Sequence, residues 1–201
     1  MSTLNYYATH ASDFASDTVA VDFTTTQKRF LKYLAPGASI LDFGCGSGRD
    51  SKYFLEQGYR VTAIDGCKEL CALASAYTGL AVQQMLFQEL TAVAQFDGLW
   101  ACASILHVPK NQLPDIFQRI CRALKPGGYA YLSFKYGSFE GKRNGRYFTD
   151  LTESQLSEIL LSVPGLQLVE QWVSADVRPG RENEKWLNII CCTDSHREHV
   201  K

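Results

Sequence analysis

The fold of this chain is decided by the stretch ILDFGCGSG at residues 40–48. Its first residues are mostly apolar, as in a buried strand, and glycines then occupy every second position, 44, 46 and 48, before a segment of helical period. Glycine permits a sharp turn and a close backbone approach to a ligand. The helix that follows offers free N–H groups, which suit an anion. The stretch therefore predicts a strand–turn–helix unit with a ligand at the turn.

Short apolar runs alternate with segments of helical period from this stretch to residue 135. Such alternation is typical of a parallel sheet with crossover helices, and strands covered by helices on both faces have mostly continuous apolar runs. We therefore expect a doubly wound α/β fold. The predicted strands are 39–43, 60–64, 81–85, 98–103 and 129–134, and the predicted helices are 49–57, 68–77 and 112–124.

The flanking segments have weaker patterns. Residues 23–34 predict a helix that ends before Pro36-Gly37, whereas the first twenty residues are aromatic but weakly periodic. Residues 136–150 are rich in glycine and charge and are expected to form a loop. A capping-box spacing at residues 152–155 predicts a further helix. The last two strands, 166–175 and 185–193, have a short link that permits only an antiparallel pair.

Composition excludes several classes of protein. The 201 residues suit one domain, and a net charge of -1 provides no general attraction to nucleic acid or membrane surfaces. No apolar run approaches the length of a membrane span and the N-terminus does not resemble a secretory signal, so a cytoplasmic location is expected. Seven cysteines, mostly in apolar runs, predict reduced thiols. Without C-x-x-C and with few histidines, we expect no metal.

An acidic residue follows the glycines at an informative spacing. Asp65 lies 17 residues after Gly48, at the end of the second predicted strand, where it is placed for two ribose hydroxyls. A dinucleotide motif would have a further glycine where Arg49 stands, and Asp42 would repel a pyrophosphate but attract an ammonium group. The pattern favours an adenosine-type ligand with an amino-acid end. The alternatives are a glycine turn without a ligand and an Asp65 that caps a helix.

At this point the sequence resembles the class I S-adenosylmethionine-dependent methyltransferases. The resemblance rests on ILDFGCGSGRDSKYFLEQGYRVTAID (40–65), FDGLWACASILHV (96–108) and ALKPGGYAYLSF (123–134), and it covers roughly residues 23–135. It implies a seven-stranded, Rossmann-like sheet whose last strand is antiparallel and inserted between the fifth and sixth. It also implies S-adenosylmethionine as cofactor. The cofactor-binding residues expected on this basis are Asp42, Gly44, Cys45, Gly46, Gly48, Asp65, Gly66, Leu86, Phe87 and Ala101.

A narrower resemblance concerns the N-terminus. Residues 6–11 and 49–51 are similar to small bacterial methyltransferases of the tellurite-resistance or small-molecule branch. In that branch the N-terminal segment folds over the cofactor, which would place Tyr6, Tyr7 or His10 at the mouth of the site. We thus expect one domain, 1–201, with a covering segment (1–36), a cofactor-binding core (37–135) and a C-terminal part (136–201). Packing of these aromatic residues on the sheet is the alternative.

The acceptor side is predicted from residues that follow the strands, because ligands of open α/β sheets bind at the carboxyl ends of strands. His107 has the pKa range of a general base, with a packing role as the alternative, and Ser104 and Tyr7 are the other catalytic candidates. Residues 135–148 carry four cations against one acid, which suits an anionic substrate, with a solvated charge run as the alternative. The substrate-binding candidates are Lys135, Tyr136, Arg143 and Arg146.

The leading hypothesis is a methyltransferase for a small, anionic acceptor. The alternatives are an RNA methyltransferase, with residues 135–146 and the tail 196–201 as contacts, and a non-catalytic cofactor-binding module. A nicotinamide oxidoreductase is disfavoured by the glycine spacing. The chain lacks the N/D-P-P-Y/F sequence of amino-methylating nucleic-acid enzymes and the carboxylates of magnesium-dependent catechol-type enzymes. The acceptor atom and the oligomeric state are not determined by the sequence.

Overall fold

A seven-stranded sheet forms the centre of the molecule, in a computed structural model that describes residues 2–195. All neighbouring strands pair in parallel except β9, which is antiparallel to both of its neighbours, β5 and β8. The strand order is β3-β2-β1-β4-β5-β9-β8. This order confirms the predicted doubly wound fold with an inserted antiparallel strand. The strands are β1 (Ser39–Phe43), β2 (Arg60–Asp65), β3 (Gln83–Gln84), β4 (Phe96–Ala101), β5 (Leu124–Lys135), β8 (Leu166–Ala175) and β9 (Lys185–Thr193).

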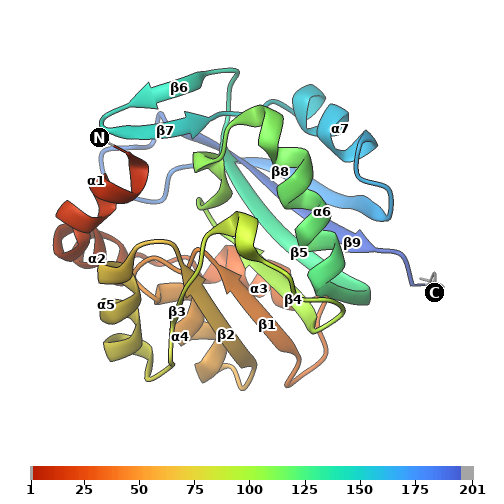
Figure 1. Ribbon diagram of the computed structural model, residues 1–201, viewed down its shortest axis with the longest axis horizontal. Helices are drawn as coiled ribbons and strands as arrows, with labels where there is room; N and C mark the ends of the chain where they lie inside the picture. Colours follow the sequence, from red (N-terminus) through yellow and green to blue (C-terminus); the bar gives the residue numbers. More distant parts are fainter. Residues whose placement is uncertain (1, 196–201) are drawn as a thin grey trace.

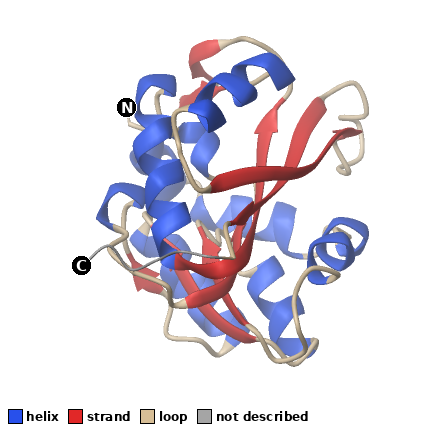
Figure 2. Ribbon diagram, turned by 90° about the vertical axis from the view of Figure 1, so that its right-hand side faces the viewer, coloured by secondary structure: helices blue, strands red, loops and turns tan. Residues whose placement is uncertain are grey.

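Helices cover both faces of the sheet. Figure 1 shows α6 and α7 in front of the sheet and α3 and α4 behind it, and Figure 2 shows the twisted sheet between these layers. Each crossover returns the chain to the same edge, so the strands β1, β2 and β4 all end on one side of the molecule. The helices are α3 (Thr24–Leu31), α4 (Arg49–Glu56), α5 (Lys68–Thr78), α6 (Leu113–Ala123) and α7 (Glu153–Leu161).

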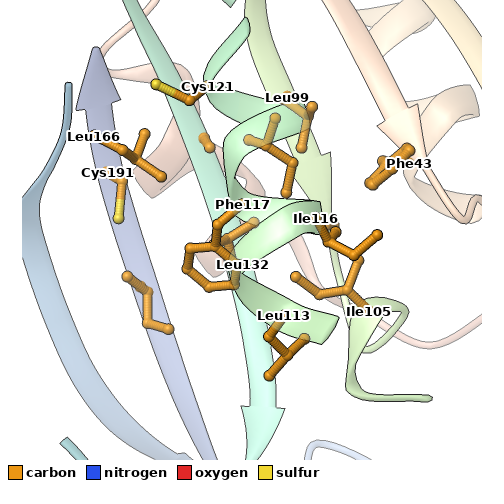
Figure 3. Close-up of a cluster of buried hydrophobic side chains, with 14 of the residues drawn as sticks. Phe43, Leu99, Ile105, Leu113, Ile116, Phe117, Cys121, Leu132, Leu166 and Cys191 are labelled. Atoms are coloured by element: carbon orange, nitrogen blue, oxygen red, sulfur yellow. The ribbon is translucent and has the colours of Figure 1, made fainter. Parts of the chain in front are cut away.

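The two faces of the sheet bury different side chains. Leu99 faces the α6 side, and its neighbour Trp100 packs on the other side against Phe30 and Phe54. On α6 the buried residues recur with helical spacing, as Figure 3 shows around Phe117. Burial of one such side chain contributes about 1.5–3 kcal/mol. This core keeps the strand ends, and therefore the site, in fixed positions.

The capping box predicted before α7 is confirmed. The Thr152 hydroxyl accepts a hydrogen bond from the Gln155 amide, and the Gln155 side chain accepts one from the Thr152 amide at 3.1 Å. These two bonds satisfy N–H groups that no helical carbonyl reaches.

The structure corrects the prediction of a loop over residues 136–150. This segment contains a hairpin, β6 (Glu140–Arg143) and β7 (Arg146–Thr149), around a two-residue turn. Asn144 and Gly145 both have positive φ, at 50° and 80°, as a type I′ turn requires. The dipeptide Asn-Gly is the strongest local signal for such a hairpin. The prediction of a loop rested on the charge and glycine content of the whole segment and did not use this dipeptide.

Smaller differences concern element bounds. The weakly periodic N-terminus forms two helices, α1 (Thr3–Thr9) and α2 (Ala11–Val19), and the expected strand 81–85 shrinks to β3. The predicted helix 112–124 ends at Ala123, because Leu124 already pairs with Phe96 as part of β5. β5 thus begins before Pro126-Gly127-Gly128, and its pairing with β4 is irregular there and resumes at Tyr129.

Candidate functional site

The glycine turn lies at the carboxyl end of β1. Gly44, Gly46 and Gly48 have φ values of 89°, 55° and 82°, which side chains with a Cβ rarely adopt. A Cβ on Gly44 would lie 2.5 Å from the Cβ of Ser104, and one on Gly46 would lie 3.1 Å from the Phe14 ring. The turn therefore needs glycine for both its backbone conformation and its space.

Asp65 lies beside this turn, at the end of β2. Its carboxylate accepts hydrogen bonds from the backbone amides of Gly46, at 2.9 Å, and Cys67, at 2.8 Å. Burial raises the pKa of Asp65, and these two bonds act in the opposite direction. A carboxylate has about four acceptor directions, so two remain for hydroxyl donors.

Two further carboxyls lie beneath the turn. Asp42 is 2% exposed and accepts a hydrogen bond from Ser51 at 2.6 Å, and burial together with the nearby Asp50 raises its pKa to about 8. Asp50 accepts from Gln27, Arg49 and Trp100. Asp42 does not border the cavity described below, so the structure places it as a support of the turn.

A cavity of about 740 Å³ extends from the glycine turn along the carboxyl ends of the strands. Side chains of α1 and α2 and of the β6–β7 hairpin close it from above, and Figure 1 shows α1 next to that hairpin. Helix α3 contributes no residue to the lining. The predicted residues that line the cavity are Tyr7, Gly44, Cys45, Gly46, Asp65, Gly66, Leu86, Phe87, Ser104, His107, Lys135, Tyr136, Arg143 and Arg146. Those that do not are Asp42, Gly48 and Ala101.

Three predicted residues meet on one wall of the cavity. The Tyr7 hydroxyl lies 2.9 Å from Nε2 of His107 and 3.4 Å from Nη1 of Arg146. Nδ1 of His107 lies 2.6 Å from the carbonyl oxygen of Tyr147. Burial lowers the pKa of His107 to about 4, with Arg146 acting in the same direction, and burial raises the pKa of Tyr7. The imidazole is therefore neutral at pH 7.

The remaining catalytic candidate is engaged elsewhere. The Ser104 hydroxyl donates a hydrogen bond to the Phe43 carbonyl at 2.6 Å, so its proton is directed away from the cavity. The cysteines among residues 2–195 form no disulfide, and burial raises the pKa of Cys45 in the glycine turn far above its usual range. Neither residue presents a reactive group in this arrangement.

The cations among residues 135–148 have different partners. Arg143 donates to both oxygens of Asp150, at 2.9 and 2.7 Å, and Lys135 pairs with Glu184 and lies 3.5 Å from Asp176. Arg146 has no ion pair among residues 2–195, and its Nε–H lacks a hydrogen-bond partner there. Its guanidinium lies 4.8 Å from the ring centre of Tyr6 and 5.2 Å from that of Phe148. Arg146 is thus a cation among aromatic rings at the cavity.

Several lining residues escaped the sequence analysis. Phe14 and Thr18 come from α2, whose periodicity is weak, and Asp176 and Trp186 flank the β8–β9 link. Trp186 pairs with Lys135 across the antiparallel β5–β9 ladder. Because an antiparallel strand begins where its neighbour ends, the predicted strand pair already placed residues near 185 at the site.

Residues 2–195 show neither a metal site nor a membrane-spanning helix. No cluster of three or more histidine, cysteine or acidic side chains there has the arrangement of a metal site. None of the helices in this range combines the length and the hydrophobicity that crossing a membrane requires.

The chain matches a known family over its central part. Residues 40–128 match the model of a methyltransferase domain. This range contains the glycine turn, Asp65 and His107, in the positions described above. Residues 40–128 are a class I S-adenosylmethionine-dependent methyltransferase domain. The resemblance inferred from the sequence motifs is thereby confirmed, whereas the tellurite-resistance branch stays a prediction.

Relatives of the methyltransferase domain include curated proteins and a solved structure. A malonyl-[acyl-carrier protein] O-methyltransferase from Enterobacter lignolyticus is 34% identical over 95 residues, 45% of this chain and 36% of the relative. A ubiquinone biosynthesis O-methyltransferase from Xanthomonas oryzae pv. oryzae is 35% identical over 105 residues, 48% and 43% respectively. The chain thus spans less than half the length of these curated relatives.

The solved structure is similar over nearly its whole length. It is a 1,6-didemethyltoxoflavin-N1-methyltransferase from Burkholderia thailandensis with bound 1,6-didemethyltoxoflavin and S-adenosylhomocysteine. The two chains are 27% identical with a TM-score of 0.71, and the match covers 96% of this chain and 90% of the other. Residues 40–128 do not include α1, α2, the β6–β7 hairpin or the β8–β9 strand pair, all of which contribute residues to the cavity.

Proposed function

We propose that this protein transfers the methyl group of S-adenosylmethionine to a small molecule with an anionic group. One observation carries the proposal: a single cavity runs from the glycine turn and Asp65 to Arg146, a cation without an acidic partner among the described residues. Its volume of about 740 Å³ lies toward the upper end of the range for small-molecule pockets, about 300–1,000 Å³, which suits a cofactor together with a small acceptor.

The residues of the methyltransferase domain fit the cofactor. When bound, S-adenosylmethionine supplies an electrophilic methyl carbon on a sulfonium. Gly44 and Gly46 border the cavity with backbone atoms, which the amino-acid end of the cofactor can approach closely, and the two remaining acceptor directions of Asp65 suit ribose hydroxyls. Leu86 and Phe87 provide an apolar border for the adenine. The chain's task is to orient the reactants and exclude water, since methyl transfer is an in-line displacement.

The acceptor part of the proposal rests on the partners of the cations. Arg143 is neutralised by Asp150, and Lys135 by Glu184 and Asp176, so Arg146 is the cation best suited to an external anion. A small acceptor also agrees with the name of the solved relative, a 1,6-didemethyltoxoflavin-N1-methyltransferase. Alignment of both reactants in one cavity favours an acceptor that fits within it.

The RNA alternative receives less support from the hairpin. Arg143 and Arg146 border the cavity, where they are occupied by Asp150 and by aromatic rings, instead of forming an open basic surface. The tail 196–201, which was the second expected RNA contact, lies outside the described residues. Salt-dependent binding of an RNA to the wild-type protein would favour this alternative.

Calorimetry with S-adenosylhomocysteine tests the cofactor part. A dissociation constant in the micromolar range, about -8 kcal/mol, is expected for the wild-type protein. NAD should show no binding. An absence of S-adenosylhomocysteine binding by folded protein would overturn the proposed function.

Arg146→Ala tests the acceptor part. It should raise KM or lower kcat at least tenfold on an anionic acceptor and leave the affinity for S-adenosylhomocysteine within twofold, because the two ligands touch different residues. Arg146→Lys should restore only part of the activity, since an ammonium cannot form two parallel bonds. The control is Lys142→Ala, which removes an exposed cation of the same hairpin that does not line the cavity. Equal effects of the two alanine variants would remove Arg146 from the acceptor site.

A further inference from the structure

The hydrogen-bonded pair Tyr7 and His107 borders the cavity and has no part in the function proposed so far. Tyr7 comes from α1, and His107 from the short turn Ile105–His107 after β4. The hydroxyl oxygen and Nε2 lie 2.9 Å apart, although 100 positions separate the residues in the chain. The pair therefore joins the cover of the cavity to the methyltransferase domain.

The direction of this hydrogen bond follows from the other side of the imidazole. Nδ1 lies 2.6 Å from the Tyr147 carbonyl oxygen, and a carbonyl oxygen can only accept. Nδ1 therefore carries the hydrogen. Because burial keeps the imidazole neutral, Nε2 has a lone pair and accepts the hydrogen of the Tyr7 hydroxyl.

This direction limits what Tyr7 can do toward a ligand. Its single hydrogen is given to His107, and its oxygen keeps two lone pairs. The Arg146 Nη1, at 3.4 Å, donates toward one of them. A group that approaches Tyr7 from the cavity can therefore bond to it only by donating a hydrogen.

We propose that the methyl acceptor carries a hydrogen on its reacting nitrogen or oxygen, and that Tyr7 takes this proton while passing its own to His107. The inference rests on the proposed methyl transfer and adds the chemical class of the acceptor. That class comprises phenol-like O–H groups and heteroaromatic or amide-like N–H groups. Thioethers and tertiary amines lie outside it.

The step balances in atoms and electrons. The acceptor lone pair forms a bond to the methyl carbon, and the carbon–sulfur bond breaks with its electrons remaining on sulfur. The acceptor proton moves to the Tyr7 oxygen, and the Tyr7 proton moves to Nε2 of His107. The products are S-adenosylhomocysteine, the methylated acceptor and an imidazolium whose Nδ1–H remains bonded to the Tyr147 carbonyl, and the imidazolium returns its proton to solvent.

The charged and titratable neighbours of the pair come from several elements. Arg146 of β7 favours negative charge on the Tyr7 oxygen and disfavours the imidazolium. Asp65 at the end of β2 and Tyr6 of α1 act on Tyr7 in the opposite sense to Arg146. Arg178, beyond the end of β8, also interacts with Tyr7.

The tautomer can be tested without any acceptor. The ¹⁵N chemical shifts of His107 in the complex with S-adenosylhomocysteine at pH 6.5 should show a protonated Nδ1 and an unprotonated Nε2. The opposite tautomer, or an imidazolium at this pH, would overturn the proposal. Neither result depends on turnover.

Kinetics with His107→Gln test the proton transfer. Glutamine can still accept the Tyr7 hydrogen bond through its side-chain oxygen but cannot take the proton. The probes are lumazine-6-carboxylate, which has ring N–H groups, and 4-hydroxybenzoate, which has a phenol O–H; each carries a carboxylate for Arg146. The variant should lower kcat at pH 6 by about 100-fold or more, since general-base catalysis contributes about 10²–10⁴. Its kcat should rise tenfold per pH unit below the acceptor's own pKa, where the wild-type rate stays flat.

Matched controls separate this role from a structural one. Tyr7→Phe should resemble His107→Gln, whereas Tyr33→Phe, which removes a hydroxyl bonded to Glu170 outside the cavity, should leave kcat unchanged. Affinity for S-adenosylhomocysteine should stay within threefold in all variants. A pH profile of His107→Gln identical to that of the wild type would overturn the relay alone, whereas loss of S-adenosylhomocysteine binding by the wild type would overturn the proposed function.

Discussion

At the scale of single residues, the glycine turn combines two requirements that are separable by experiment. Gly46 has a positive φ and lies next to the Phe14 ring of the cavity cover, whereas Gly58 has a positive φ, 84°, with open space around it. Both positions disfavour a side chain by about 1–2 kcal/mol for the backbone conformation. Only Gly46 borders the cavity.

Gly46→Val should therefore weaken S-adenosylhomocysteine binding by at least about thirtyfold, which corresponds to about 2 kcal/mol. Gly58→Val should leave the affinity within twofold, although both variants lose similar stability from the backbone. Calorimetry of the ligand and urea unfolding of both proteins provide the comparison. An unchanged affinity of Gly46→Val would show that the cofactor does not approach this turn.

At the scale of elements, the contact between α1 and the β6–β7 hairpin covers the part of the cavity that Arg146 borders. The Tyr147 amide donates to the Thr3 hydroxyl at 2.9 Å, and Tyr6 packs against the turn of the hairpin. A Cβ on Gly145 would lie 2.7 Å from Cδ2 of Tyr6. Gly180, with φ 76°, has no neighbour within 4 Å of such a Cβ.

Gly145→Ala should consequently destabilise the protein by about 1–3 kcal/mol more than Gly180→Ala, because both variants have the strain of a positive φ and only the first displaces a packed ring. The free energies of unfolding in urea give the difference directly. Equal losses in the two variants would mean that α1 does not pack tightly on the hairpin.

At the scale of the whole molecule, the buried carboxyl of Asp42 couples folding to pH. Its folded-state pKa of about 8 lies above the ordinary value of 3.8, because burial and Asp50 disfavour the carboxylate. Between these two values the folded state keeps a proton that the unfolded state has released. The contribution of Asp42 to stability therefore falls as pH rises through this window.

Asp42→Asn removes this titration. Its free energy of unfolding relative to the wild type should rise by about 1.4 kcal/mol for each unit between pH 5 and pH 7.5. Asp97→Asn is the control. Burial raises the pKa of Asp97, but the ion pair with Lys125 and hydrogen bonds from Ser39 outweigh it and hold this pKa at about 2. The effect of Asp97→Asn on the free energy of unfolding should therefore be constant between about pH 5 and pH 7.5. If the free-energy difference between Asp42→Asn and the wild type were also constant over this range, Asp42 would be an ionised carboxylate throughout it.

The sequence by itself determined the parts of the molecule that depend on local pattern. Continuous apolar runs indicated buried parallel strands, the short link between residues 175 and 185 required an antiparallel pair, and the glycine turn with Asp65 marked one end of the cavity. The Asn144-Gly145 turn was also a local signal, although the expectation of a loop missed it.

Only the tertiary structure decided which distant residues meet. Tyr7 contacts His107, which lies 100 positions away in the chain. Arg143 pairs with Asp150, whereas Arg146 has no acidic partner among residues 2–195. The buried Asp42 accepts a hydrogen bond from Ser51. These contacts depend on how α1, the hairpin and the strand ends pack together. Composition and periodicity describe which face of an element is buried, but a side-chain partner is chosen by the arrangement of all the elements in space.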